Sequence, residues 1–219
     1  MITKDKVTPY HDYIVSKRRD FHMHPEPGFM EFRTSKIIKE ELLKFGFELE
    51  EGIGVTGIVG TLKGIHPGKT VGYRADIDAL LMQEENDVPY KSTYDGVMHS
   101  CGHDTHTAML LGTAKFFSEH RDLLHGTLKV IFQSAEEGPM PGGGISVVEG
   151  GYIDSCDAVF GNHITARDMC GTIAIKKGPA MAAPDEFKIK IIGTGTHASA
   201  PHTGQDPLLT ASQIIIAFQ

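Results

Sequence analysis

The apolar residues in the first third of the chain follow helical spacing and then strand spacing. Residues 9–21 place apolar side chains three and four positions apart and are followed by two prolines, so a helix is expected there. A second helix is expected over residues 34–46, with Thr34 as its N-cap. Residues 55–62 and 71–78 have the apolar runs and two-residue alternation that are typical of strands.

The middle of the chain repeats this succession of elements. A largely apolar helix is expected over residues 107–117, a buried strand over 128–132 and a short helix over 144–149. Two further short strands are expected over residues 158–160 and 172–175. Strands that alternate with helices predict an α/β domain in which a mixed sheet is layered with helices.

The last part of the chain has the pattern of a second, smaller domain. From Pro184 onward, residues 187–192 alternate like a half-exposed strand, and Asp206 precedes a helix whose first residue is proline. The apolar pattern of that helix still continues where the sequence stops. We therefore expect an incomplete α/β domain over residues 1–183 and the beginning of a smaller α+β domain over residues 184–219.

Composition narrows the classes of partner. The chain carries a formal net charge of −7 and has no run of lysine or arginine, so a nucleic-acid partner is not expected. Its three cysteines are irregularly spaced and the N-terminus has no apolar leader, which favours a reducing compartment over a disulfide framework. No apolar run approaches the ~20 residues of a membrane span. We therefore expect a soluble, cytoplasmic protein with no membrane partner.

The densest group of potential metal ligands lies between His99 and His106. These eight residues contain three histidines, a cysteine and an aspartate. Cys101 and His103 are two positions apart, so in an extended segment their side chains would face one point, where a thiolate and an imidazole suit a divalent cation. A zinc finger is a poor alternative because no Cys-x-x-Cys pair is present. A cysteine protease would give no role to the paired glutamates that follow in the chain.

Those paired glutamates, Glu136 and Glu137, come just after the expected strand over residues 128–132. Adjacent side chains diverge where a strand ends, so one carboxylate can bind a metal while the other accepts a proton from the water that the metal activates. His163 follows the expected strand over residues 158–160 and supplies a further imidazole. Together these residues indicate a hydrolytic metal centre at the strand ends of an α/β sheet.

Four other polar residues each admit two interpretations. Asp76 and Asp78 lie at the end of an expected strand, where they either cap the strand or orient metal ligands from behind. His99 and His106 flank the candidate ligands and either orient them or serve the structure alone.

Four motifs resemble, in the same order, those of the metal-dependent amidohydrolases, a group that includes aminoacylases, hippurate hydrolases, auxin-conjugate hydrolases and N-acetyl-diaminopimelate deacetylases. The segment His22–Gly28 is similar to the opening motif of the same group. The resemblance therefore runs along the whole chain. The four motifs are Arg74–Leu80, His99–Asp104, Phe132–Glu137 and Gly195–His202.

The resemblance implies a di-metal, aminopeptidase-like catalytic domain, followed by a lid domain that serves dimerisation. It also implies two divalent metal ions (manganese, zinc or cobalt), a homo-oligomer in the full-length family, and hydrolysis of the amide bond of an N-acyl amino acid or a short peptide. On the matching positions, Glu136 would be the general base, and His197 would hold the substrate or its oxyanion from the lid. The implied metal ligands are Cys101, His103, Glu137 and His163.

Length is where the chain departs from that family. Its members are longer and complete the lid, so we expect this sequence to be truncated and to lack a last histidine ligand. Two alternatives to an active amidohydrolase follow. The chain could be a catalytically inactive remnant that binds metal, or the protein could be a metal-dependent peptidase of the same family.

Overall fold

The computed structural model describes residues 2–183, 185 and 187–219, which form two compact units. The first unit is Met1–Asp168 and the second is Met169–Gln219. The predicted domain boundary begins at Pro184, which lies outside the described residues, so that boundary stays a prediction. Among the described residues, no helix combines the length and the apolar composition that crossing a bilayer requires.

A five-stranded mixed sheet forms the centre of the first unit, as the alternation of elements predicts. Its strand order is β1-β2-β4-β3-β5. The pairs β1–β2 and β2–β4 are antiparallel, whereas β3 pairs in parallel with both β4 and β5. The strands are β1 (Glu48–Ile53), β2 (Gly57–Lys63), β3 (His66–Asp76), β4 (His125–Gln133) and β5 (Ala158–Gly161).

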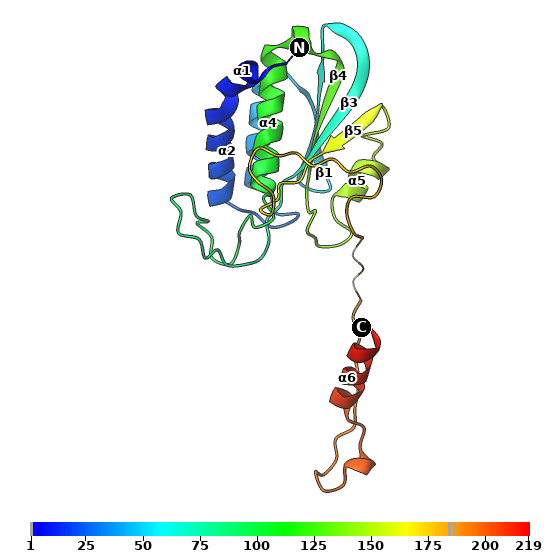
Figure 1. Ribbon diagram of the computed structural model, residues 1–219. Coiled ribbons are helices and arrows are strands. Elements are labelled where there is room, and N and C mark those ends of the chain that lie inside the picture. Colours follow the sequence, from blue (N-terminus) through cyan, green and yellow to red (C-terminus); the bar gives the residue numbers. More distant parts are fainter. Residues whose placement is uncertain (1, 184, 186) are drawn as a thin grey trace. The chain divides into compact units, whose positions relative to one another are not determined.

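Helices cover the two faces of this sheet unequally. Figure 1 shows α2 (blue) beside α4 (green) on one face, and α3 packs on the same side. The short helix α5 contacts the opposite face. The helices of the first unit are α1 (Lys4–Val7), α2 (His11–Met23), α3 (Phe32–Lys44), α4 (His103–Glu119) and α5 (Gly144–Glu149); the second unit contains α6 (Pro207–Ala217).

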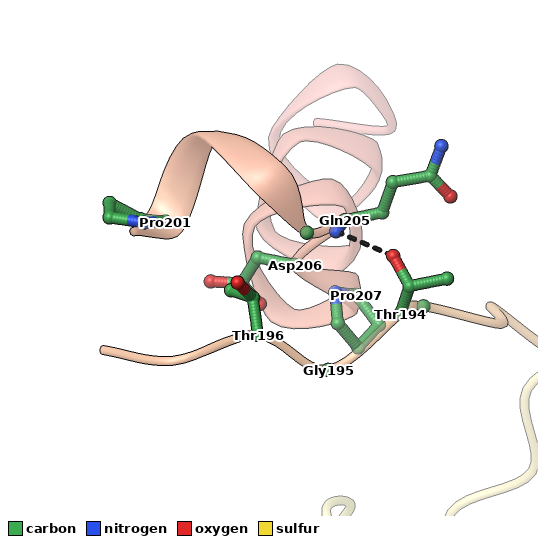
Figure 2. A pocket seen from close by; sticks show the side chains of 9 residues that line it. Thr194, Gly195, Thr196, Pro201, Gln205, Asp206 and Pro207 are labelled. Carbon is green, nitrogen blue, oxygen red and sulfur yellow. Dashed lines mark hydrogen bonds between the residues drawn. The ribbon is translucent and has the colours of Figure 1, made fainter. Parts of the chain in front are cut away.

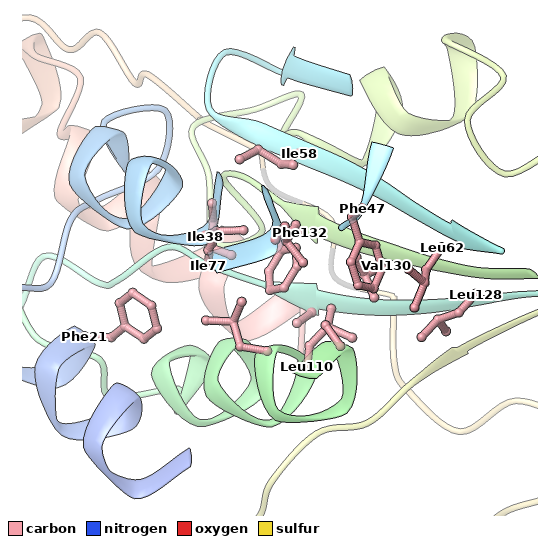
Figure 3. Packing of buried hydrophobic residues seen from close by; sticks show 14 of the residues in the cluster. Phe21, Ile38, Phe47, Ile58, Leu62, Ile77, Leu110, Leu128, Val130 and Phe132 are labelled. Atoms are coloured by element: carbon pink, nitrogen blue, oxygen red, sulfur yellow. The ribbon is translucent and has the colours of Figure 1, made fainter. Parts of the chain in front are cut away.

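The alternation of side chains along the central strand β4 explains these layers. Val130 and Phe132 are buried in the main core with Leu110 of α4 (Figure 3), whereas Ile131 between them points to the other face. There Ile131 packs with Val147 of α5. Because this part of β4 is buried on both faces, Val130, Ile131 and Phe132 form a short apolar run, which is why a buried strand was predictable there.

The predicted N-cap of the second helix is wrong. Thr34 lies inside α3, which begins at Phe32 and has Glu31 as its N-cap residue. The backbone N–H of Thr34 donates to Oε2 of Glu26 at 2.8 Å. The carboxylate of Glu26 therefore accepts N–H groups of the first turn that have no partner within the helix. A search of the sequence for a cap residue next to the helix cannot find such a distant acceptor.

Two predicted strands, over residues 172–175 and 187–192, are not strands in the structure. The large apolar side chains in these segments are mostly exposed, and an alternating sequence forms a strand only where a neighbouring strand supplies ladder hydrogen bonds. The expected helix after Asp206 does form, and the side chain of Asp206 accepts hydrogen bonds from the backbone N–H groups of Leu208 and Leu209.

Candidate metal centre

The polar residues predicted for the site meet at one edge of the sheet. Because β3, β4 and β5 run parallel, their carboxyl ends lie at the same edge. Asp76 ends β3, the paired glutamates follow β4, and His163 follows β5. The helix α4 begins at this edge with His103. Polar side chains from four segments that are far apart in sequence therefore lie at the same edge of the sheet.

His103 lies at the centre of the group. Its ring nitrogens lie within 4.8 Å of a ligand atom of Cys101 and of His163, and a second set within the same limit joins His103 to Glu136 and Glu137. The Cys101 Sγ atom lies 3.2 Å from Nε2 of His163. The structure thus brings together all four predicted metal ligands and the predicted base.

Hydrogen bonds determine which nitrogen each histidine presents to the group. Nδ1 of His103 donates to the backbone carbonyl of Asp78 at 3.0 Å and to its Oδ1 at 3.1 Å, which leaves Nε2 buried with no hydrogen-bond partner among the described residues. Nδ1 of His163 donates to the carbonyl of Ile164 at 2.6 Å. Both rings therefore present Nε2, the usual arrangement when imidazole binds a metal.

The carboxylate of Asp78 orients two of the predicted ligands at once. Its Oδ1 faces His103, and its Oδ2 accepts the backbone N–H of Glu137 at 2.9 Å. Asp78 is 1% exposed, so these contacts replace the water that it would otherwise bind. Of the two interpretations of Asp78, the structure therefore supports the one in which it orients ligands.

Asp76 and His106 form a second supporting pair. Oδ1 of Asp76 accepts from Nδ1 of His106 at 2.6 Å, and its Oδ2 accepts from Arg74 at 2.7 Å. Burial acts to raise the pKa of Asp76, but the bond from His106 and the neighbouring positive charges together hold it at about 2. The other ring nitrogen of His106 accepts the backbone N–H of Ile164 at 3.0 Å. The pair thus holds the loop that carries His163.

The centre is strongly negative. Burial, together with a hydrogen bond to Glu137 and the charges of Glu137, Asp76 and Glu136, raises the pKa of the Cys101 thiol to about 12. Burial and the charges of the neighbouring carboxylates also raise the pKa of Glu136. Such a cluster is stabilised by a divalent cation, which favours the thiolate and removes the repulsion between the carboxylates.

The local geometry of Cys101 and His103 differs from the extended segment considered above. Gly102 between them has a φ of 85°, in the left-handed region, and His103 is already the first residue of α4. A Cβ on Gly102 would lie 2.3 Å from the side chain of Ile164, so the turn also allows a close approach of that loop. The two side chains converge through this turn rather than through strand alternation.

Asp104 and His99 belong to the His99–His106 run but are not members of the groups of ligand atoms described above. Asp104 Oδ2 lies 2.7 Å from Nδ1 of His22 and 2.9 Å from Nε of Arg18, so it ties α4 to α2. His99 is 4% exposed, and neither of its ring nitrogens has a hydrogen-bond partner among the described residues. Sequence reasoning assigned no role to Arg18 or to the side chain of His22. Their four-residue spacing on one helix face was the signal that could have found them.

His197, the predicted residue of the lid, belongs to the second unit and is exposed. Its Nδ1 accepts the backbone N–H of Ser199 at 3.2 Å and lies 2.8 Å from the hydroxyl of the same residue. The ring proton is therefore on Nε2, which has no hydrogen-bond partner in the part of the chain that the structure describes. The hydrogen bonds of the His197 side chain are to Ser199 of the same unit.

A pocket in the second unit lies close to His197 in sequence but has little chemistry of its own. Figure 2 shows it between the turn at Thr194 and the start of α6, where the backbone N–H of Gln205 donates to Oγ1 of Thr194 at 2.9 Å. Among the described residues that line it, the only charged one is Asp206, whose carboxylate already caps α6. We assign no ligand to this pocket.

Comparison with known proteins identifies the family of the chain. The sequence profile of peptidase family M20/M25/M40 matches residues 72–216. Thermostable carboxypeptidase 2 of Saccharolobus solfataricus is 47% identical over 216 residues, which are 98% of this chain and 55% of that protein. IAA-amino acid hydrolase ILR1-like 4 of Arabidopsis thaliana is 42% identical, over 100% of this chain and 49% of its own length.

A solved structure supports the fold as well as the family. The YXEP protein of Bacillus subtilis, described as a dinuclear metal binding peptidase of the M20 family, superposes with a TM-score of 0.73 at 40% identity. The superposition covers 78% of this chain and 47% of that one. This chain thus spans about half the length of the relatives it matches. It belongs to peptidase family M20/M25/M40, and the resemblance to the metal-dependent amidohydrolases, drawn from its motifs, is confirmed.

Proposed function

We propose that this chain supplies most of a two-metal centre with which the protein hydrolyses the amide bond of N-acyl amino acids. The observation that carries the proposal is the buried, unpartnered Nε2 of His103, around which a thiol, a second imidazole and two carboxylates converge. Leaving a buried ring nitrogen without a partner is unfavourable unless another group binds it. A metal ion explains this arrangement, and the relative YXEP is described as dinuclear.

The donor set suits the borderline metals that the sequence analysis named. A thiolate with two imidazoles and a carboxylate is typical of zinc and cobalt sites, and manganese tolerates imidazole with carboxylate. When bound, a pair of such ions supplies Lewis acidity, which activates water and polarises the amide carbonyl. The residues that would hold the pair are Cys101, His103, Glu137 and His163.

Glu136 is suited to the proton transfers. Its carboxylate is partly exposed, and its Oε2 lies 3.8 Å from Nε2 of His103, beside the ligands. Its side chain has no hydrogen-bond partner among the described residues, in contrast to the fully engaged Asp78. Glu136 accepts a proton from the attacking water and then delivers it to the nitrogen of the leaving amine.

His197 is proposed to stabilise the oxyanion that develops on the amide carbonyl. The bond from Ser199 N–H to its Nδ1 leaves the proton on Nε2, so the ring carries the donor that an oxyanion requires. Exposure of His197 in its own unit leaves that donor free to meet a substrate.

Peptidase action is the second candidate because the relative with 47% identity is named a carboxypeptidase. Both candidates cut an amide whose nitrogen belongs to an amino acid with a free carboxylate. They differ only in whether the acyl side is a small acid or a peptide. The same hydrolytic machinery serves either substrate, so the choice depends on the acyl pocket.

The test is hydrolysis of a panel of N-acetyl amino acids, N-benzoyl amino acids and dipeptides by the purified chain, with and without added Mn²⁺. Turnover that needs metal and is lost in Glu136→Gln supports the proposal. Preference for dipeptides favours the peptidase. Metal retained at the ligands without any turnover supports the inactive remnant, in which case the activity needs a longer chain.

A further inference from the structure

The segment Glu26–Glu31 lies against the loop that carries the paired glutamates. The proposed mechanism gives its last residue, Glu31, no task. We propose that Glu31 is a positioning residue whose buried carboxylate holds this loop in the conformation that presents Glu136 and Glu137. The inference rests on the proposed function, because it concerns the same centre.

Both oxygens of the Glu31 carboxylate are engaged by segments that are distant in sequence. Oε1 accepts the backbone N–H of Ala135 at 2.8 Å, and Oε2 accepts the hydroxyl of Thr56 at 2.5 Å. Glu31 is 0% exposed, and its partners are 104 and 25 residues away. A buried carboxylate that is fully satisfied by such partners fixes their relative positions, because losing either contact would leave a charged oxygen without a donor.

The backbone of the loop after β4 has an unfavourable conformation at Ala135, the residue whose N–H donates to Glu31. Ala135 has a φ of 47°, in the left-handed region that is unfavourable for a residue with a Cβ. It is 0% exposed and lies directly before Glu136. The unusual backbone turns the chain as it leaves β4, so a group that stabilises Ala135 in this conformation also sets the direction in which the next two side chains leave the strand.

Two buried carboxylates therefore hold the backbone on either side of Glu136. Glu31 accepts the N–H of Ala135, and Asp78 accepts the N–H of Glu137 at 2.9 Å. Glu136 is the residue between these two fixed points. Its own side chain is free of hydrogen bonds within the described residues, so its position depends on the backbone rather than on contacts of its carboxylate.

The neighbouring backbone supports the same conclusion. A Cβ added to Gly28 would lie 1.9 Å from the carbonyl oxygen of Gly138 and 3.0 Å from Cβ of Ala135, so the segment is in direct contact with the loop. The carbonyl of Glu26 accepts the N–H of Ala79 at 2.9 Å, which joins the segment to the residues that follow β3 as well. Burial raises the pKa of Glu31, and the bonds from Thr56 and Ala135 act in the opposite direction by favouring the carboxylate.

Three substitutions at Glu31 distinguish the effects of the length, the charge and the volume of its side chain. Glu31→Gln keeps both contacts, because its carbonyl accepts from Ala135 and its amide donates to the Thr56 hydroxyl. Glu31→Asp keeps the charge but is one methylene shorter and cannot reach both donors. Glu31→Leu keeps the volume and removes both acceptors. The matched control is Glu41→Leu, which removes a 9% exposed carboxylate that is held by Tyr13 instead.

The first measurement is amide hydrogen exchange of the loop after β4, followed in the metal-free chain. We expect the Ala135 N–H to exchange at least about tenfold faster in Glu31→Asp and Glu31→Leu than in the wild type. Exchange in Glu31→Gln and Glu41→Leu should stay close to that of the wild type. If Glu31→Leu fails to fold, Glu31→Asp carries the test. Unchanged exchange at Ala135 in Glu31→Asp would overturn the inference.

The second measurement is the visible spectrum of the Co²⁺-loaded chain, since its thiolate and ligand-field bands report the geometry of the ligands. We expect altered ligand-field bands in Glu31→Asp and, where turnover is measurable, a kcat lower by about tenfold to a hundredfold with KM nearly unchanged. Wild-type spectra in folded Glu31→Asp would overturn the positioning role. A wild-type chain that binds no Co²⁺ would instead refute the proposed function, while hydrogen exchange still decides the role of Glu31.

Discussion

Replacing Asp78 by asparagine tests whether the metal centre depends on its supporting carboxylate. The aspartate accepts from Nδ1 of His103 at 3.1 Å and from the backbone N–H of Glu137 at 2.9 Å, with a different oxygen for each. Asparagine has nearly the same shape but only one acceptor oxygen. In either orientation its NH₂ group faces one of the two donors, so one of the two side-chain contacts is lost. Nδ1 of His103 keeps its bond to the backbone carbonyl of residue 78, so the loss weakens the support of a predicted ligand without removing it.

The expected magnitude follows from what such contacts contribute elsewhere. Loss of one hydrogen bond behind a metal ligand weakens binding by about 10- to 100-fold, which is about 1.4 to 2.8 kcal/mol. Asp78 is 1% exposed, so water cannot replace the missing acceptor without a rearrangement of the backbone. We therefore expect Asp78→Asn to lower the metal affinity by a factor within this range. Asp78→Ala should lower the metal affinity at least as much.

The assay is a Zn²⁺ competition titration of the chain against a chromophoric chelator at fixed pH. Asp157→Asn is the matched control, because Asp157 also accepts a backbone N–H, that of Thr70 at 2.8 Å, but does so at an exposed position. Affinity of Asp78→Asn within about twofold of the wild type would refute the reasoning, since one misdirected contact would then have no measurable effect.

Three further predictions concern stability. Leu42→Ala on α3, where the leucine is 0% exposed, should lower the free energy of unfolding by about 2 to 5 kcal/mol in urea titrations and leave Zn²⁺ affinity unchanged. Gly28→Ala should lower both stability and metal affinity in the same assays, because the new Cβ would lie 1.9 Å from the Gly138 carbonyl. Burial acts to raise the pKa of Glu41, but hydrogen bonds from Tyr13 and two lysines outweigh it and lower the pKa below its ordinary value of 4.5. The ionised carboxylate is therefore stabilising above that pH, and the difference in melting temperature between the wild type and Glu41→Gln should shrink as the pH falls through the folded-state pKa; a constant difference would contradict this.

Regular elements with strong apolar patterns were predictable from the sequence. The helix over residues 144–149 has the predicted bounds, and the helix over 107–117 is confirmed but begins four residues earlier, at His103. That first turn contains buried polar residues whose partners come from other elements, so its pattern does not look like a helix start. The edge strand β1 (Glu48–Ile53) was missed because it is rich in glutamate and mostly exposed, which weakens the apolar signal that identifies central strands.

The candidate ligands were predictable because metal chemistry uses few residue types and collects them at strand ends. Cys101, His103 and the paired glutamates each stand out in the sequence, and the parallel arrangement of β3, β4 and β5 explains why they meet. Nothing comparable marks the residues that support them. A glutamate at the start of a helix is common, and only the three-dimensional structure shows that Glu31 contacts a residue 104 positions away.

This difference has a physical cause that extends to the centre as a whole. A ligand is recognised by its own atoms, whereas a supporting residue is defined by its partners, and here those partners are backbone N–H groups that every residue except proline possesses. The N–H groups of Ala135, Glu137 and Ile164 are each accepted by a side chain from another segment. Substitutions at the side chains that accept these N–H groups should therefore change the geometry of the metal centre although every metal ligand is kept. The metal affinities and Co²⁺ spectra of the Glu31 and Asp78 variants measure how much of that geometry is set by the backbone.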